Sequence, residues 1–305
     1  MPELPEVETV RIGLNRLIIG KVIDDVEYNW DKSFPNAKDD VEAFVIGAKI
    51  TNVRRRAKVL LIDLSTEYSL VIHLKMTGQL VFVLQQKPQA LRTNIETLNK
   101  SEIRFGAGHP NDSLVGALPD KSTRVVFTFS DSSQLFFNDQ RKFGWIKLIK
   151  SSAVQNIAFI KNLGPEPLDN NFTQTQFRDR LLKRPNTNVK AALLDQSVIA
   201  GVGNIYADES LWGARIHPTT LVKNISLQQM NTLYSELLYV LNLAIQKGGS
   251  SDKNYVNAEG KKGSYLSFAR VFRREGLTCP RCGSVIIKTR VASRGTHTCP
   301  RCQSI

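Results

Sequence analysis

The chain begins with Met1-Pro-Glu-Leu-Pro-Glu6, and a pattern typical of an amphipathic helix starts inside this stretch. Pro5 suits a first helical turn, because its missing N–H would have no partner there. The acidic Glu3 and Glu6 suit the positive end of the helix dipole. Apolar residues then recur at spacings of three and four, as the buried face of a helix requires: Leu4, Val7, Val10, Leu14 and Leu17.

The same stretch offers a nucleophile. Removal of Met1 would leave Pro2 with a secondary amine at the start of the chain. Because an α-amine titrates at about 7.7–8.0, a good fraction would be neutral at working pH. A nucleophilic amine beside the carboxylate of Glu3 is a candidate Schiff-base catalyst. The alternative is a capped helix without catalysis, which this stretch alone favours.

The composition indicates a protein with a polyanionic partner. The 305 residues suffice for one large domain or two ordinary ones, and 41 Lys and Arg against 28 Asp and Glu give a net charge of +13. This excess favours nucleic acid over an anionic membrane, although an inert basic surface is the alternative. No apolar run approaches the roughly 20 residues of a membrane span, and no secretory signal is visible. We therefore expect a cytoplasmic protein.

All four cysteines lie near the C-terminus, in Cys279-Pro-Arg-Cys282 and Cys299-Pro-Arg-Cys302. Two Cys-x-x-Cys turns separated by sixteen residues have the spacing of a four-cysteine zinc ribbon. Four thiolates leave no open coordination position, so the zinc would be structural and His297 a bystander. Free or disulfide-bonded cysteines are the alternative. Lys253 to Arg301 contain eleven Lys and Arg but two acids, which favours phosphate contact, with Arg294 near a hairpin tip.

The organisation of the remaining chain changes near residues 150–165. Before this boundary, short runs rich in Val, Ile and Phe predict an antiparallel sandwich or barrel, interrupted by a long loop or insertion at 85–120 with a helical turn at 94–99. The expected strands are Lys49–Arg55, Val59–Leu64, Leu70–Leu74, Leu80–Leu84, Arg124–Phe129, Gln134–Phe137 and Trp145–Ile149. After it, the pattern predicts helices at Thr173–Leu182, Val189–Leu194, Gly203–Trp212 and Ser226–Gln246.

Three further groups of residues are candidates for DNA contact. Two glycines in Ala200-Gly-Val-Gly-Asn-Ile-Tyr206 would let backbone N–H groups approach an anion, and Asn204 could cap the following helix and bind phosphate. Lys58 stands at the entrance of a strand beside a basic run. The third group would lie at loop tips and suit insertion into a base stack, with core packing as the plainer alternative: Met76, Arg141 and Phe143.

Together these stretches resemble one family, the bacterial formamidopyrimidine-DNA glycosylases, also called 8-oxoguanine DNA glycosylase/AP lyases. The matching stretches, in the family's order, are Pro2-Glu-Leu-Pro-Glu-Val-Glu-Thr9, Arg55-Arg-Ala-Lys58, His73-Leu-Lys-Met-Thr-Gly78, Leu163-Gly-Pro-Glu-Pro-Leu168, Gly201-Val-Gly-Asn-Ile-Tyr206 with His217-Pro218, and the paired Cys-x-x-Cys with Arg294.

The resemblance implies an α+β protein with a β-sandwich flanked by helices at 1–150, a helical domain with a helix–two-turns–helix motif at 151–267, and a zinc ribbon at 268–305. It implies a monomer with one structural zinc ion, associated with the nucleoid. The implied activity removes oxidised purines from double-stranded DNA and cleaves the abasic site by β,δ-elimination.

The resemblance also implies roles for residues. Pro2 would attack C1′ of the damaged nucleoside, and Glu3 would act as general acid/base at the sugar. Lys58 would assist β-elimination, and Arg294 would assist δ-elimination. Further residues would contact DNA or fill the gap left by the everted base: Arg184, Lys190, Asn204, Met76, Arg141 and Phe143. The segment 248–267 would cover that base.

Two departures from the family accompany the resemblance. A histidine that commonly contacts DNA is replaced by Ser122, so its contact is either absent or taken over by Arg124. The stretch 85–120 is longer than usual. The rival interpretations are an endonuclease VIII-like glycosylase for oxidised pyrimidines, a zinc protein that binds damaged DNA without cutting it, and an RNA-binding zinc ribbon.

Overall fold

The computed structural model describes residues 2–85, 102–109, 111–250 and 265–304. Contacts within the chain divide it into two compact units. Of the described residues, the N-terminal unit comprises 2, 6–85, 102–109 and 111–156, and the C-terminal unit comprises 3–5, 157–250 and 265–304. Within the described residues, every helix is too short or too polar to cross a bilayer.

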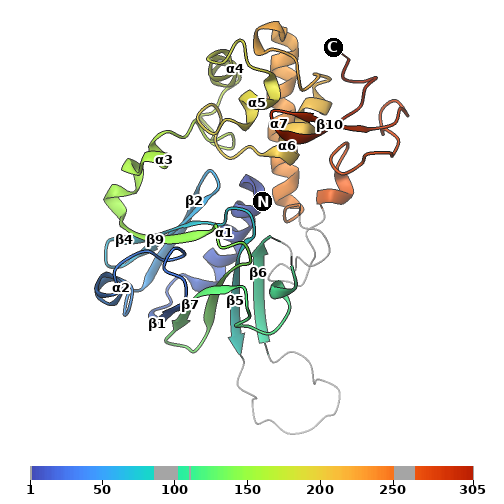
Figure 1. The fold of residues 1–305 in the computed structure, drawn as a ribbon. Coiled ribbons are helices and arrows are strands. Elements are labelled where there is room, and N and C mark those ends of the chain that lie inside the picture. Colours follow the sequence, from blue (N-terminus) through green and yellow to red (C-terminus); the bar gives the residue numbers. More distant parts are fainter. Residues whose placement is uncertain (1, 86–101, 110, 251–264, 305) are drawn as a thin grey trace, which may run out of the picture. The chain divides into compact units, whose positions relative to one another are not determined.

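Two antiparallel sheets form the N-terminal unit (Figure 1). One sheet has the order β1 (Ile23–Tyr28), β7 (Thr123–Phe129), β8 (Gln134–Asp139), β5 (Gly78–Gln85) and β6 (Glu102–Gly108). The other has the order β2 (Ile50–Arg56), β3 (Val59–Leu64), β4 (Tyr68–His73) and β9 (Trp145–Lys150). One apolar cluster draws buried side chains from both sheets, so they form the two layers of a sandwich.

The helix predicted at the start of the chain is α1 (Leu4–Ile18), and its residues Val7, Val10 and Leu14 lie in this core. A glycine in the middle of the helix, Gly13, permits close packing against strand β6. A Cβ atom at Gly13 would lie 2.0 Å from Cζ of Phe105, so the ring occupies the space of a side chain. The remaining helical segments of this unit are α2 (Lys38–Phe44), η1 (Asp112–Leu114) and η2 (Ser151–Asn156).

Strand β6 corrects the expectation of a long loop over 85–120. It pairs with β5 in antiparallel register, with Phe82 opposite Phe105, and buries Phe105 and Ala107 in the sandwich core. Gly106 and Gly108 are typical of turns and hid the strand in the sequence, although Ile103, Phe105 and Ala107 alternate with them. Residues 102–108 are therefore part of the sandwich, whereas the helical turn expected at 94–99 lies outside the described residues.

The C-terminal unit is mainly helical, and polar caps fix where α4, α5 and α7 begin. Its helices are α3 (Ala158–Lys161), α4 (Gln174–Leu182), α5 (Val189–Leu194), α6 (Asn204–Gly213) and α7 (Leu227–Gln246), with η3 (Val222–Asn224) and η4 (Tyr265–Phe268). Thr173 caps α4, Asn188 caps α5, and Ser226 forms a capping box with Gln229 at α7. Apolar side chains of α4, α5, α6 and α7 form a second core.

The last part of the chain forms a two-stranded hairpin of β10 (Ile287–Val291) and β11 (Arg294–Thr298). Its two connecting residues, Ala292 and Ser293, have φ angles of 51° and 60°. Positive φ at both positions is typical of a type I′ turn, which matches strand twist but favours Asn and Gly. Arg294 is therefore the first residue of β11, directly after the tip.

Candidate functional site

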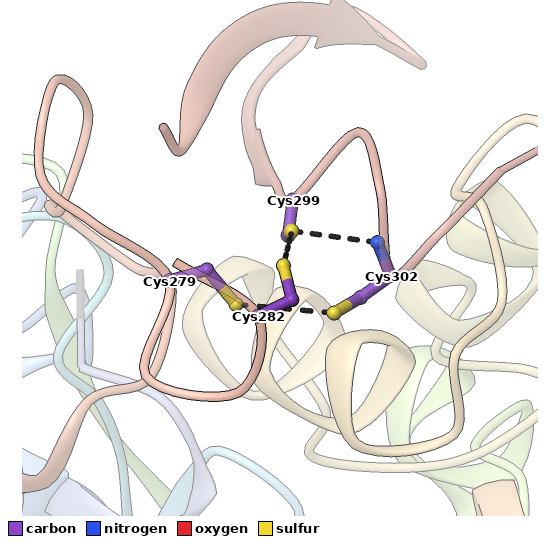
Figure 2. Close-up of side chains that lie close together, drawn as sticks. All are labelled: Cys279, Cys282, Cys299 and Cys302. Carbon is purple, nitrogen blue, oxygen red and sulfur yellow. Dashed lines mark hydrogen bonds between the residues drawn. The ribbon is translucent and has the colours of Figure 1, made fainter. Parts of the chain in front are cut away.

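Four cysteine side chains converge from the two Cys-x-x-Cys turns (Figure 2). Their Sγ atoms all lie within 4.8 Å of one another, with 3.9 Å between Cys279 and Cys302 and 3.3 Å between Cys282 and Cys299. Thiolates at about 2.3 Å from a tetrahedral zinc ion lie about 3.8 Å apart, so the four sulfur atoms fit the ion expected from the spacing. The Cys302 amide also donates to Cys299 Sγ at 3.4 Å.

Trp212 of α6 anchors this cysteine cluster to the helices. Its Nε1–H donates to Cys279 Sγ at 3.4 Å, and its ring is buried against the cluster. The guanidinium carbon atoms of Arg281 and Arg270 lie 3.8 Å and 4.9 Å from the centroid of the ring. The metal site is thus supported by an aromatic residue of the helical core and by two cations.

Asn204 and Lys190 hold the hairpin near Arg294. Asn204 does not cap α6, because Gly203 occupies the N-cap position, and instead its Nδ2 donates to the Gly295 carbonyl at 2.9 Å. Lys190 is fully buried and paired with Asp208, with 2.6 Å between Nζ and Oδ1. Lys190 is thus engaged within the protein, and the contact with phosphate expected of it stays a prediction.

The glycine turn before α6 receives a carboxylate of the protein itself. Glu3 is buried, and its Oε1 accepts from the Ile205 N–H at 3.2 Å, in the first turn of α6. A Cβ atom at Gly203 would lie 2.1 Å from Cδ of Glu3, so only glycine allows this approach. The Leu4 N–H donates to the Gly201 carbonyl at 3.2 Å. The turn therefore holds the carboxylate of Glu3, which fixes the chain immediately after the buried Pro2, and a phosphate contact at Asn204 stays a prediction.

Lys58 follows a tight turn between β2 and β3. Ala57 has a φ of 52°, and its carbonyl accepts from Arg55 Nη1 at 2.8 Å. Arg55 Nε in turn donates to Glu8 of α1 at 2.9 Å. Although burial opposes it, hydrogen bonds from Arg11 and Arg55 lower the pKa of Glu8, so this carboxylate stays ionised. Lys58 itself is 8% exposed.

Met76 and Phe143 lie on neighbouring turns of the N-terminal unit. Together with Lys32, Lys75 and Lys142 they line a hollow of about 460 Å³. Phe143 is 53% exposed, which contradicts the alternative that it packs in the core. An exposed phenylalanine and a half-buried methionine amid lysines suit contact with nucleic acid.

One carboxylate organises the turn that carries Arg141. The Oδ2 atom of Asp139 accepts from the Gly144 amide at 2.6 Å, and its Oδ1 accepts from the Arg141 amide at 3.2 Å. Thr77, beside Met76, bridges both turns: its hydroxyl accepts from the Arg141 amide at 3.1 Å and donates to Asp139. Arg141 is exposed, and its guanidinium carbon lies 4.8 Å from the centroid of the Phe143 ring.

Three family models match consecutive parts of the chain. They are described as the formamidopyrimidine-DNA glycosylase N-terminal domain over residues 1–146, the formamidopyrimidine-DNA glycosylase H2TH domain over 163–255, and a zinc finger found in FPG and IleRS over 276–305. The formamidopyrimidine-DNA glycosylase of Latilactobacillus sakei is 37% identical over 288 residues, which cover 94% of this chain and 92% of the relative. The chain belongs to the formamidopyrimidine-DNA glycosylase family.

Other members of this family agree with that assignment. The formamidopyrimidine-DNA glycosylase of Halalkalibacterium halodurans is 39% identical over 292 residues, covering 95% of this chain and 94% of the relative. Two solved structures of the Lactococcus lactis enzyme, one with DNA containing an abasic site and one of a mutant with Fapy-dG DNA, superpose over 100% of both chains with a TM-score of 0.82 and 32% identity. The two-domain α+β fold and the single structural zinc ion predicted from the sequence are confirmed.

Two arginines expected at DNA have protein partners in this member of the family. Arg124 is buried, and its Nε, Nη1 and Nη2 donate to the carbonyls of Asp139, Thr123 and Lys121 at 3.0, 3.2 and 2.9 Å. The guanidinium of Arg124 is thus engaged within the protein, and the DNA contact expected of it stays a prediction. Arg184 keeps half of its side chain exposed while pairing with Asp195 at 3.2 Å.

Several residues that build the glycosylase site escaped the sequence interpretation. Asp139 lies just beyond a predicted strand, and Asp208 and Trp212 lie within a predicted helix, without any further signal in the sequence. Their roles depend on partners distant in sequence: Asp208 pairs with Lys190, and Trp212 donates to Cys279. A local sequence pattern does not reveal contacts of this kind. Most of the segment expected to cover the base, 251–264, lies outside the described residues.

Proposed function

We propose that this glycosylase removes oxidised purines, such as 8-oxoguanine and formamidopyrimidines, from double-stranded DNA and then cleaves the abasic site by β,δ-elimination. The observation that carries the proposal is the fixed position of Glu3, whose carboxylate is held on the first turn of α6 directly after Pro2. A carboxylate held in this way can exchange a proton at the sugar while the preceding amine attacks it. The enzyme acts as a monomer in the cytoplasm, at the nucleoid.

The chemistry begins with the secondary amine of Pro2. The amine attacks C1′ and the N-glycosidic bond breaks, so the base leaves with a proton. The C1′–O4′ bond of the sugar then breaks, O4′ takes a proton from Glu3, and an iminium forms between Pro2 and C1′. The iminium acidifies the C2′ proton, whose loss expels the 3′ phosphate, and a second elimination expels the 5′ phosphate. Glu3 exchanges protons at the sugar, and the cations Lys58 and Arg294 stabilise the departing phosphates.

The lesion has to leave the base stack before this chemistry begins. Unstacking costs a few kcal/mol, and apolar side chains inserted into the vacancy offset part of that cost. Met76 and the exposed Phe143 supply these side chains, while Arg141 lies over the ring of Phe143 and carries the positive charge toward DNA. Asp139 holds the turn that presents Arg141 and Phe143.

Borohydride trapping on DNA that contains 8-oxoguanine opposite cytosine tests the proposal. Reduction of the iminium links protein to DNA covalently, and the linked peptide should begin with Pro2. Pro2→Gly should lose base excision but keep lesion binding, whereas Pro5→Ala, a matched change in the same stretch, should keep both. Retained excision in Pro2→Gly would show that the nucleophile is another group.

Two further substrates separate the rivals. An endonuclease VIII-like enzyme would prefer thymine glycol to 8-oxoguanine, and an RNA-binding ribbon would bind undamaged RNA equally well. Lesion binding without any trapped adduct would indicate a protein that recognises damage without cutting. Because the proposed nucleophile requires removal of Met1, N-terminal mass analysis should accompany the assay: protein that retains Met1 should be inactive.

A further inference from the structure

A chain of buried polar contacts connects the helices of the C-terminal unit to Arg294. Lys190 on α5 and Asp208 on α6 are both fully buried and lie 2.6 Å apart. Lys190 Nζ donates to the hydroxyl of Thr296 at 2.6 Å, and that hydroxyl donates to the carbonyl of Arg294 at 3.0 Å. Thr296 is also fully buried, so these polar contacts are shielded from water.

We propose that Lys190 and Asp208 are a positioning pair which, through Thr296, sets the backbone at Arg294 for the second elimination. The inference rests on the proposed role of Arg294 and assigns Lys190 a task other than phosphate binding. Neither Lys190 nor Asp208 touches DNA in this arrangement, and both act through the hairpin.

The three protons of the Lys190 ammonium are all engaged within the protein. Besides Asp208 and Thr296, Nζ donates to the Gly295 carbonyl at 3.3 Å. An ammonium group has three donors and no acceptor, so none remains for a phosphate. Burial lowers the pKa of Lys190 while Asp208 opposes this shift, and the charges of Glu3 and Arg294 also act on it. The ammonium thus lies within the electrostatic reach of both proposed catalytic side chains.

The hairpin needs such an anchor next to its tip, where two residues hold unfavourable backbone angles. Ala292 and Ser293 hold positive φ angles immediately before Arg294. From Arg294 to His297, successive residues are then held from outside the hairpin or through its own polar contacts. The Gly295 carbonyl accepts from both Lys190 and Asn204, and the His297 amide donates to Asp208 Oδ2 at 2.9 Å. Because strained turns persist only where their surroundings fix them, this anchoring sets the direction of β11.

Thr296→Val and Thr296→Ser form the first test, because valine keeps the shape of threonine and serine keeps its hydroxyl. On DNA with a preformed abasic site, Thr296→Val should lower the ratio of β,δ- to β-elimination product on the order of tenfold to a hundredfold, since small misplacements have such effects. Thr296→Ser should stay within about twofold of the original protein. Both variants should trap DNA with borohydride as the original does. An unchanged product ratio in Thr296→Val would overturn the proposal.

The pair itself is tested by Lys190→Met, alone and combined with Asp208→Leu. The single change leaves a buried charge unpaired and should destabilise the fold, whereas the double change removes both charges and should restore thermal stability. Both variants should show a low ratio of β,δ- to β-elimination product, because the contact of Lys190 with Thr296 is missing in each. Arg178→Met, which breaks an exposed ion pair with Asp179 on α4, is the control and should change neither property. Recovery of the product ratio in the double variant would contradict positioning by the pair.

Amide hydrogen exchange separates this inference from the proposed chemistry. The double variant should exchange faster at residues 294–297 than the original protein, with α7 unchanged. Faster exchange together with no borohydride adduct in the original protein would refute the Schiff-base mechanism and leave the anchoring intact. Unchanged exchange at 294–297 would refute the anchoring, whatever the trapping result.

Discussion

The sandwich of the N-terminal unit and the zinc hairpin of the C-terminal unit both carry residues with a proposed role, but different interactions stabilise them. The sandwich surrounds an apolar core with six buried phenylalanines: Phe34, Phe82, Phe105, Phe127, Phe129 and Phe137. The cluster at the hairpin contains Trp212, Val271, Ile286 and two of the four cysteine ligands. The sandwich therefore depends on burial of apolar surface, and the hairpin depends on metal and buried charge.

Different interactions therefore hold the functional side chains of the two regions in place. Arg141 and Phe143 lie in the turn that follows β8, a strand packed in the large apolar core. The carboxylate of Asp139 holds this turn by accepting hydrogen bonds from the Arg141 and Gly144 amides. Arg294 follows a strained turn in a module too small for a core of its own. Loss of the zinc ion or of a buried partner should thus disable Arg294 while the sandwich stays folded.

Zinc removal should have the largest effect. Structural zinc binding contributes about 10–16 kcal/mol in finger peptides, so a strong chelator should unfold residues 276–304. Hydrogen-exchange mass spectrometry should show lost protection there and unchanged protection in β2, β3 and β4. Cys279→Ser should have the same effect and weaken DNA binding. Unchanged zinc content and affinity in that variant would contradict the dependence on metal.

Phe137→Ala should destabilise the sandwich and leave the zinc site of the hairpin intact. The ring is fully buried, and truncation of a buried phenylalanine costs about 3–5 kcal/mol. Chemical denaturation should show this loss of stability, while the bound zinc measured by atomic absorption should remain one ion per chain. Phe268→Ala removes a ring that is 47% exposed and serves as the control. Zinc loss from folded Phe137→Ala protein would mean that the two regions are not independent.

His73 should make the sandwich sensitive to acid. Burial, with the nearby charges of Lys75 and Lys58, lowers the pKa of His73 to about 3, and its Nδ1 accepts from the Lys75 amide at 3.0 Å. Between about pH 6.5 and 3 the unfolded chain binds a proton at this position that the folded chain excludes, so stability falls as pH falls, by up to about 1.4 kcal/mol per unit. Urea denaturation across this range should show a shallower slope in His73→Gln. An identical slope would exclude His73 as the cause.

The smallest effect should come from the hairpin tip. Ala292→Asn with Ser293→Gly supplies the residues that a type I′ turn favours and should raise the stability of the zinc-bound hairpin by about 1 kcal/mol. Ala292→Val, which places a β-branched residue at positive φ, should lower it. Exchange rates of the β10–β11 amides measure both changes. Equal rates in the two variants would mean that the tip carries no strain.

Much of this architecture follows from local sequence pattern. The limits of α5 agree with the predicted helix at Val189–Leu194, and the cysteine spacing identified the zinc ligands, because periodicity and ligand spacing are local properties. Strand β6 escaped because Gly106 and Gly108, which are typical of turns, stand within it. The burial of Lys190 also escaped, because it depends on Asp208, eighteen residues away on another helix. The anionic partner of the glycine turn is likewise distant, since Glu3 lies about two hundred residues before Ile205.

The fluorescence of Trp212 should report on the metal centre. Of the three tryptophans, Trp30 and Trp145 lie in the N-terminal unit, so Trp212 is the only indole chromophore of the C-terminal unit. Guanidinium groups near its ring and a thiolate acceptor at its N–H make its emission sensitive to any rearrangement of the zinc ligands. With Trp30 and Trp145 replaced by phenylalanine, the protein would carry a built-in fluorophore that follows the metal centre in real time, without a label.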